Sequence, residues 1–161
     1  MSESWPVTEE GTVSIRQKAN FNLKQLYKTF HDFSQEYQYK FNEKNFTRKD
    51  KSDGSEYQIE WAFERKITQF TKFKIDVEIW SLRTTEEKGM FRGDLEMNFN
   101  AVMEMDYESK WETNNFTKLL RKIYIYYFNK PYFLRYAGKL WSEVYDLHAR
   151  AKTTLNQFPL N

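Results

Sequence analysis

The chain contains no cysteine and only two histidines, His31 and His148. The lack of cysteine excludes disulfides, thiolate nucleophiles and every zinc site built on cysteine, and it is consistent with a reducing compartment. Each histidine lies in a helical pattern without a cluster of metal-ligand residues nearby, where a surface or packing role is the ordinary one. We therefore expect no metal site, no cofactor and a cytoplasmic protein.

The sequence also lacks the motifs of common catalytic sites. It has no glycine-rich phosphate loop and no nucleophile elbow, and it holds only five glycines and three prolines. Acidic residues spaced by two, such as Asp94, Glu96, Glu104 and Asp106, are typical of the solvent face of a strand rather than of an acid/base pair or a metal site. No catalytic residue is predicted, and a non-enzymatic function is favoured.

Long apolar runs are missing, whereas aromatic residues are abundant. No run approaches the ~20 residues of a membrane-spanning helix, and residues 1–12 have neither the basic start nor the apolar stretch of a signal peptide. Aromatic residues make up 19% of the 161 residues, with 14 Phe, 11 Tyr and 5 Trp. Because each aromatic side chain buries a large area, they can fill a core or line a cavity. We expect a single domain in which 1–11 is flexible.

Two periodicities divide the chain. Alternation with a period of two predicts strands at 12–19, 39–49, 56–67, 72–82 and 89–107. A period of 3.6 predicts a helix over 23–38 that Asn22 caps, and a C-terminal helical segment over 114–155 that is kinked or broken at Pro131.

The order of these elements predicts an α+β fold. Hairpin connections between strands with one polar face indicate an antiparallel sheet. The first strand must return beside the last one, and only the C-terminal helix is long enough to cover the apolar face of the sheet. We expect a curved antiparallel sheet that grips this helix, with one further helix after the first strand.

This order resembles the helix-grip fold of the START and birch-pollen-allergen-like superfamily, also called polyketide cyclase-like or SRPBCC. The resemblance is carried by "VSIRQKANFNLKQLYKTFHDFSQEY", by the two central hairpins and by "RYAGKLWSEVYDLHARAKTTL". It implies a sheet of up to six or seven strands, whereas the pattern alone gives five. It also implies an apolar small-molecule ligand for most members, chemical modification of the ligand for some, and protein partners for others.

The apolar side of 89–107 carries the candidate ligand site. Methionine adapts to apolar partners of different shape, so a dry cavity between the sheet and the C-terminal helix could hold an apolar or amphipathic, lipid-like molecule. The plainer alternative is that the same residues only form the core. Polar groups that could orient a ligand are the Tyr57 hydroxyl, the Trp141 indole and Gln17. The candidate ligand-binding residues are Tyr57, Trp61, Phe63, Phe91, Leu95, Met97, Phe99, Met103, Leu134 and Trp141.

Positive charge is concentrated near the C-terminus. Residues 1–109 carry 16 Lys and Arg against 20 Asp and Glu, whereas 110–161 carry 9 against 3. The alternative function is therefore contact with a protein partner or an anionic membrane through 118–139, and a homodimer contact is also open. The plainer alternative is that these cations balance an acidic sheet. A net charge of +2 argues against nucleic acid. The candidate surface residues are Lys118, Arg121, Lys122, Tyr126, Lys130, Arg135 and Lys139.

Overall fold

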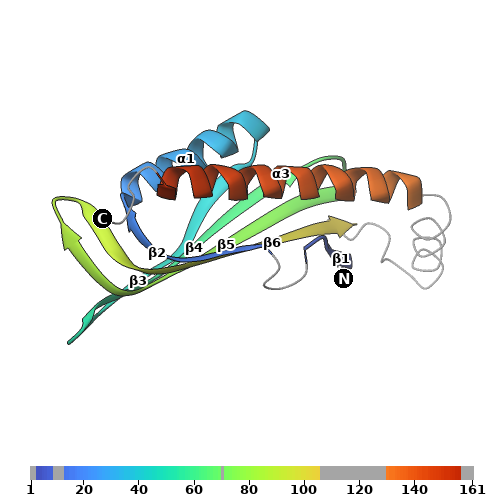
Figure 1. Cartoon of the computed structure of the whole chain (residues 1–161). Coiled ribbons are helices and arrows are strands. Elements are labelled where there is room, and N and C mark those ends of the chain that lie inside the picture. Colours follow the sequence, from blue (N-terminus) through green and yellow to red (C-terminus); the bar gives the residue numbers. More distant parts are fainter. Residues whose placement is uncertain (1–2, 9–12, 70, 106–129, 157–161) are drawn as a thin grey trace.

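The structure is a computed structural model that describes residues 3–8, 13–69, 71–105 and 130–156. It confirms the expected α+β class, with an antiparallel sheet, one helix after the first predicted strand and a long C-terminal helix packed against the sheet (Figure 1). The elements are β1 (Glu3–Pro6), β2 (Ser14–Phe21), α1 (Leu23–Tyr37), β3 (Lys40–Lys51), β4 (Gly54–Lys66), β5 (Thr71–Glu87), β6 (Met90–Met105) and α3 (Lys130–Asn156).

The sheet has the order β1-β6-β5-β4-β3, and β2 also pairs with β6. The first predicted strand therefore returns beside the last one, as expected. All pairs are antiparallel, and β2 runs from Ser14 opposite Asn98 to Phe21 opposite Phe91. This closure places the start of α1 next to the β5–β6 hairpin.

Strand β1 was not predicted, because it lies within the segment 1–11 that was expected to be flexible. It pairs with the same edge of β6 as β2 does, from Glu3 opposite Met105 to Pro6 opposite Val102. Between the two strands, the Thr8 hydroxyl accepts a hydrogen bond of 2.9 Å from the Ala101 backbone. Four residues are too few for a recognisable alternation, so this strand depends on the register that β6 offers.

Both helices lie on one face of the curved sheet (Figure 1). The strands alternate as their sequence predicts: every second residue of β6 from Leu95 to Met105 is buried. Helix α1 packs over β4, where the Phe30 and Trp61 ring centroids are 5.0 Å apart. Helix α3 packs over β6 and β2, where the ring centroids of Phe99 and His148 are 5.5 Å apart. The two helices therefore share the cover of a single core.

The ends of α1 follow from local hydrogen bonding. The Asn22 side chain accepts from the backbone amides of Lys24 (3.0 Å) and Gln25 (3.3 Å), so the predicted N-cap is confirmed. At the other end, Gln38 is left-handed with φ 62°, and the Tyr39 amide donates to the Ser34 carbonyl at 2.8 Å. This turn leads the chain directly from α1 into β3.

Helix α3 is continuous from Lys130 to Asn156. Pro131 lies in its first turn, where the missing backbone N–H removes no helical hydrogen bond. The predicted break at Pro131 thus coincides with a helix start, and 114–129 lies outside the described residues. No helix in the described part of the chain combines the length and the apolar character needed to cross a membrane.

Candidate functional site

Most of the predicted ligand-binding residues lie in the core beneath the helices. Their rings and side chains are packed against one another: Phe30 of α1 is 6.0 Å from Phe63 and 6.3 Å from Phe99, measured between ring centroids. Six of the ten are at most 2% exposed, namely Trp61, Phe63, Leu95, Met97, Phe99 and Met103. Tyr57 is also buried, whereas Phe91 is half-buried at the edge of the core.

The prediction that Leu134 and Trp141 face the sheet is wrong. Leu134 is 59% exposed and Trp141 is 38% exposed. The buried side of α3 is formed by Leu140, Val144, Leu147, Ala151 and Leu155, which recur every three or four residues. Successive residues of a helix are rotated by about 100°, so Trp141 points away from the row of buried residues that starts at Leu140. It packs instead on Tyr145 at the surface, with ring centroids 4.8 Å apart.

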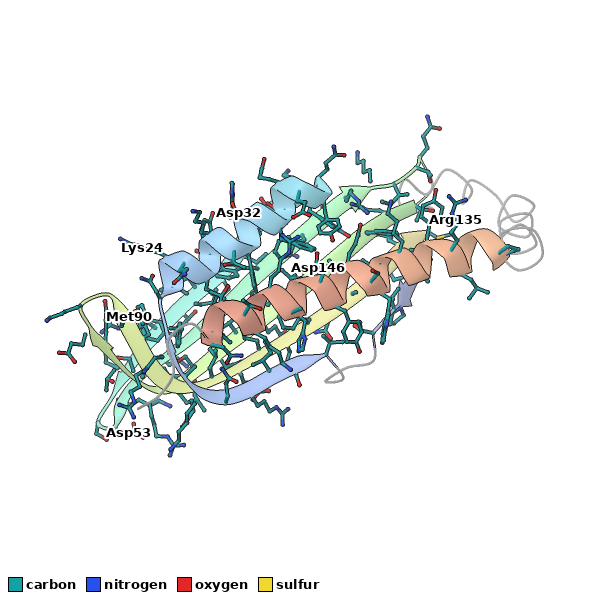
Figure 2. The ribbon with its side chains drawn as sticks, turned by 45° about the horizontal axis from the view of Figure 1, so that its top comes forward. Lys24, Asp32, Asp53, Met90, Arg135 and Asp146 are labelled. Carbon is teal, nitrogen blue, oxygen red and sulfur yellow. The ribbon has the colours of Figure 1, made fainter. Side chains whose placement is uncertain are left out.

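An open cleft of about 610 Å³ lies between the start of α1 and the β5–β6 hairpin. Figure 2 shows Lys24 of α1 and Met90 of the hairpin at this end of the molecule, far from Arg135 at the start of α3. We call it the α1–hairpin cleft. Its lining residues are Asn22, Leu23, Lys24, Tyr27, Glu43, Trp61, Glu86, Lys88, Gly89 and Phe91.

Three aromatic side chains, Trp61, Tyr27 and Phe91, form most of the apolar part of the α1–hairpin cleft. Trp61 of β4 is buried, and Tyr27 of α1 stands on it with ring centroids 5.7 Å apart and an interplanar angle of 77°. Phe91 of β6 stacks on Phe21 at 5.5 Å. Tyr27 is 44% exposed, so an aromatic surface is open to a ligand from solvent.

Polar groups surround this apolar surface. The Trp61 indole donates a hydrogen bond of 2.9 Å to the Glu43 carboxylate, which fixes the ring. Lys88 and Gly89 form the two-residue loop of the hairpin, with φ of 52° and 79°. Positive φ at both positions matches a type I′ turn, which holds the hairpin tip at the cleft. The charged lining therefore consists of Lys24 and Lys88 with Glu43 and Glu86.

Trp61 and Phe91 are the predicted ligand-binding residues that the structure brings together in the cleft. Leu23, Tyr27 and the hairpin residues were missed as site residues. Leu23 and Tyr27 were recognisable as an apolar face of α1, but their exposure depends on where the sheet curves away. The sequence signal that could have indicated the second wall is the turn "EEKG" before β6.

The predicted interaction surface is described only in part. Lys118, Arg121, Lys122 and Tyr126 lie outside the described residues, and Lys130 belongs to α3 without a described side chain. Arg135 and Lys139 are exposed on α3, as is Leu134.

Among the described residues, no three His, Asp or Glu side chains are grouped so that they could hold a metal ion. Burial is the main cause that raises the pKa of the Tyr57 hydroxyl, which stays protonated beside Phe91. Comparisons of the chain with family models, with curated proteins and with solved structures found no match.

Proposed function

We propose that the protein binds an apolar or amphipathic small molecule in the α1–hairpin cleft without transforming it. The observation that carries the proposal is an aromatic surface inside a cleft of about 610 Å³, formed by the exposed Tyr27, which packs on the buried Trp61, and by the half-buried Phe91. Ligand sites of a few hundred Å³ with an apolar lining and a few polar groups suit molecules of drug-like size. The START-like resemblance leads to the same ligand class and is part of this proposal.

The place of the site differs from the one expected from the sequence. Leu134 and Trp141 were expected to line a cavity beneath α3, and both are exposed. The α1–hairpin cleft needs neither residue. Its charged residues, Lys24 and Lys88 with Glu43 and Glu86, favour a ligand whose apolar body carries a polar end.

Tryptophan fluorescence tests the proposal directly, because Trp61 is in the cleft. We expect quenching and a rise in melting temperature with some members of a panel of fatty acids, sterols and isoprenoids. The quenching should be lost in Trp61→Phe, which keeps an aromatic ring at the same place. A panel without any response, or quenching that persists in Trp61→Phe, would contradict the proposal.

A pair of tyrosine variants locates the ligand. Tyr27→Ala removes the exposed wall of the cleft and should weaken binding about fivefold or more, since an aromatic contact is worth about 0.5–1.5 kcal/mol beyond its buried area. Tyr145→Ala is the matched control, because Tyr145 is also a helical tyrosine and is 39% exposed, but lies on α3. Equal effects of the two changes would place the ligand elsewhere.

A second candidate function is contact with a partner or an anionic membrane through the outward side of α3. It is favoured by the exposed apolar side chains of Leu134, Trp141 and Tyr145 and by the exposed cations Arg135 and Lys139 of the same helix. The double change Arg135→Glu and Lys139→Glu should abolish flotation with anionic vesicles while ligand binding in the cleft persists. If the unaltered protein neither floats nor captures a partner, this second function is refuted.

A further inference from the structure

The outward face of the sheet carries a regular grid of side chains where β2, β6 and β5 run together. Arg16 of β2 lies opposite Glu96 of β6, and Lys18 lies opposite Asp94. On the other side of β6, Glu96 faces Trp80, and Asp94 faces Leu82. Two open clefts of about 380 and 310 Å³ follow this grid and share Lys18 and Asp94.

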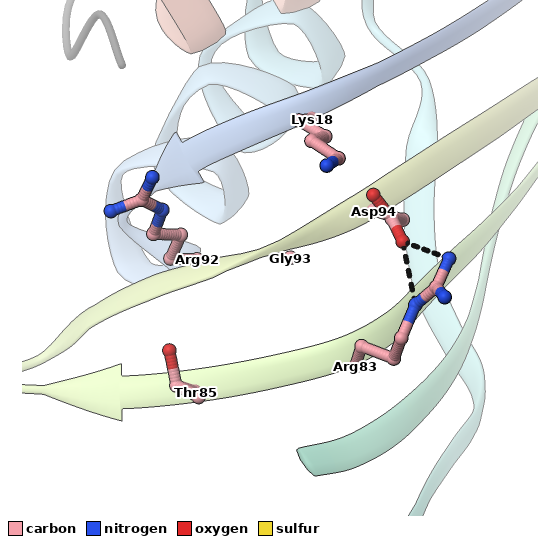
Figure 3. A pocket seen from close by; sticks show the side chains of 6 residues that line it. All are labelled: Lys18, Arg83, Thr85, Arg92, Gly93 and Asp94. Carbon is pink, nitrogen blue, oxygen red and sulfur yellow. Dashed lines mark hydrogen bonds and ion pairs between the residues drawn. The ribbon is translucent and has the colours of Figure 1, made fainter. Parts of the chain in front are cut away.

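A β-bulge re-aims one cation within this grid. The register of β5 shifts between Leu82 and Thr85, and Arg83 adopts a left-handed backbone with φ 50°. Arg83 thereby reaches Asp94 with two nitrogens, at 2.9 and 2.6 Å (Figure 3). Bulges often re-aim a side chain next to a functional site. Here the bulge neutralises the carboxylate that lies directly opposite Lys18.

The remaining charges of the grid do not balance. Arg16 pairs with Glu96 at 3.3 Å, so both carboxylates of the grid have an arginine partner. Lys18 and Arg92 form no ion pair with any residue that the structure describes, and both are exposed. They occupy diagonal cross-strand positions, which places their backbones about 7–8 Å apart. Elsewhere on this face, by contrast, Lys72 and Lys74 pair with glutamates at 3.1 and 2.8 Å.

We propose that these two adjoining clefts together bind one phosphate monoester. Its phosphate lies between Lys18 and Arg92, and its organic part lies over Trp80 and Leu82. The lining of the larger cleft has three cations and one carboxylate, so a dianion matches its charge. The smaller cleft adds the half-buried Trp80 and Leu82, which is 42% exposed, as an apolar platform. The site is on the opposite face of β6 from the α1–hairpin cleft, because Phe91 and Arg92 alternate.

Calorimetric titration with AMP, inorganic phosphate and adenosine tests the two halves of the site. We expect AMP to bind more tightly than phosphate, because a planar base can stack on Trp80, and adenosine to show no binding. Affinity for AMP should rise between about pH 5 and pH 7 as the phosphate gains its second charge. Vesicles that contain phosphatidic acid form a separate arm, which shows whether a lipid headgroup supplies the same phosphate chemistry.

Charge-reversal variants assign the binding to this cleft. Lys18→Glu with Arg92→Glu should lower the affinity for AMP, or for the vesicles, by about tenfold or more, since charge-assisted contacts are lost. Lys49→Glu is the matched control, because Lys49 is an exposed lysine on β3, outside the cleft. Trp80→Leu should reduce AMP binding to the level of inorganic phosphate.

Three results would overturn the proposal. They are an absence of binding to AMP, phosphate and phosphatidic acid vesicles alike, binding that survives the double reversal, and equal binding of adenosine and AMP. If AMP and phosphate bind equally, the platform of Trp80 and Leu82 has no role. Tyr27→Ala should leave phosphate binding unchanged, so this proposal and the proposed function can fail independently.

Discussion

Arg65 and Glu143 form the most deeply buried ion pair among the described residues, with side chains 13% and 5% exposed. One Arg65 nitrogen bonds both Glu143 oxygens, at 2.8 and 3.0 Å, and the Tyr39 hydroxyl donates to the same carboxylate at 2.6 Å. The guanidinium also lies 4.7 Å from the Tyr39 ring centroid. Burial, together with the Glu143 charge, raises the pKa of Tyr39, so its hydroxyl remains a donor.

Breaking this pair on one side should be far more harmful than replacing both sides. Glu143→Leu leaves the buried Arg65 charge without its carboxylate and should cost about 3–5 kcal/mol of unfolding free energy. Arg65→Met combined with Glu143→Leu should recover a large part of that loss, because no unpaired charge remains. Urea unfolding of the single and double variants measures this coupling. Additive losses in the double variant would show that the pair acts only through packing.

The neighbouring Tyr37 makes a pH-dependent contribution to stability. Its hydroxyl donates a hydrogen bond of 2.5 Å to Asp146, and this bond, reinforced by burial, raises the pKa of Tyr37 to about 12. The folded state therefore favours the protonated phenol. The stabilisation is complete below the ordinary pKa of about 10 and is lost as the pH rises towards 12.

Tyr37→Phe isolates that contribution. The difference in unfolding free energy between the unaltered protein and Tyr37→Phe should be constant up to about pH 9 and should shrink between about pH 10 and pH 12. Urea unfolding at a series of pH values gives both curves. A difference that stays constant throughout the alkaline range would mean that the phenol titrates normally in the folded protein.

At the scale of elements, helix α1 was predicted almost to the residue because its signals are local. Asn22 caps it, and the apolar residues behind that cap repeat with the helical period. Strand β5 was predicted to end at 82 but extends to Glu87, because the bulge at Arg83 interrupts the alternation without ending the pairing with β6. A pattern of period two cannot continue through an inserted residue, so such an extension is visible only in the structure.

The candidate site was harder to predict than the elements that form it. Tyr27, Trp61 and Lys88 meet in the α1–hairpin cleft from three separate elements. Each fits its own local pattern, and nothing in those patterns states that the sheet curves away at this end. The apolar face predicted for 89–107 was correctly placed beneath the helices from Leu95 to Met105, whereas 106–107 lies outside the described residues. Its buried residues pack against Phe30 and its neighbours in the described core.

The orientation of α3 can be tested with two leucines of the same helix. Leu147 is fully buried, so Leu147→Ala should lower the unfolding free energy by about 2–5 kcal/mol. Leu134 is exposed, and Leu134→Ala should change it by no more than about 0.5 kcal/mol. Chemical denaturation of both variants checks the assignment. A large effect of Leu134→Ala would restore the inward orientation that the sequence suggested.

At the scale of the whole molecule, the sheet has one packed face, and each of the two helices covers a part of it. Helix α1 contacts the side of β4, and α3 contacts β6 and β2. The Thr29 and Thr154 hydroxyls, 2.9 Å apart, join the helices to each other. Because β2 pairs with β6 and residues of the strands and of both helices pack in a single cluster, the edge of the sheet, its centre and both helices belong to one core.

A chain truncated after residue 129 should therefore unfold, rather than keep the remaining elements folded. Removing α3 strips the sheet of three buried leucines and Val144, which together contribute on the order of 6–12 kcal/mol. The total stability of a domain of this size is about 5–15 kcal/mol, so little or none would remain. We expect the truncated chain to lose its near-UV circular dichroism and to unfold without a cooperative urea transition. A sharp transition in the truncated chain would show that α1 and the sheet form an independent unit, and that α3 only docks onto it.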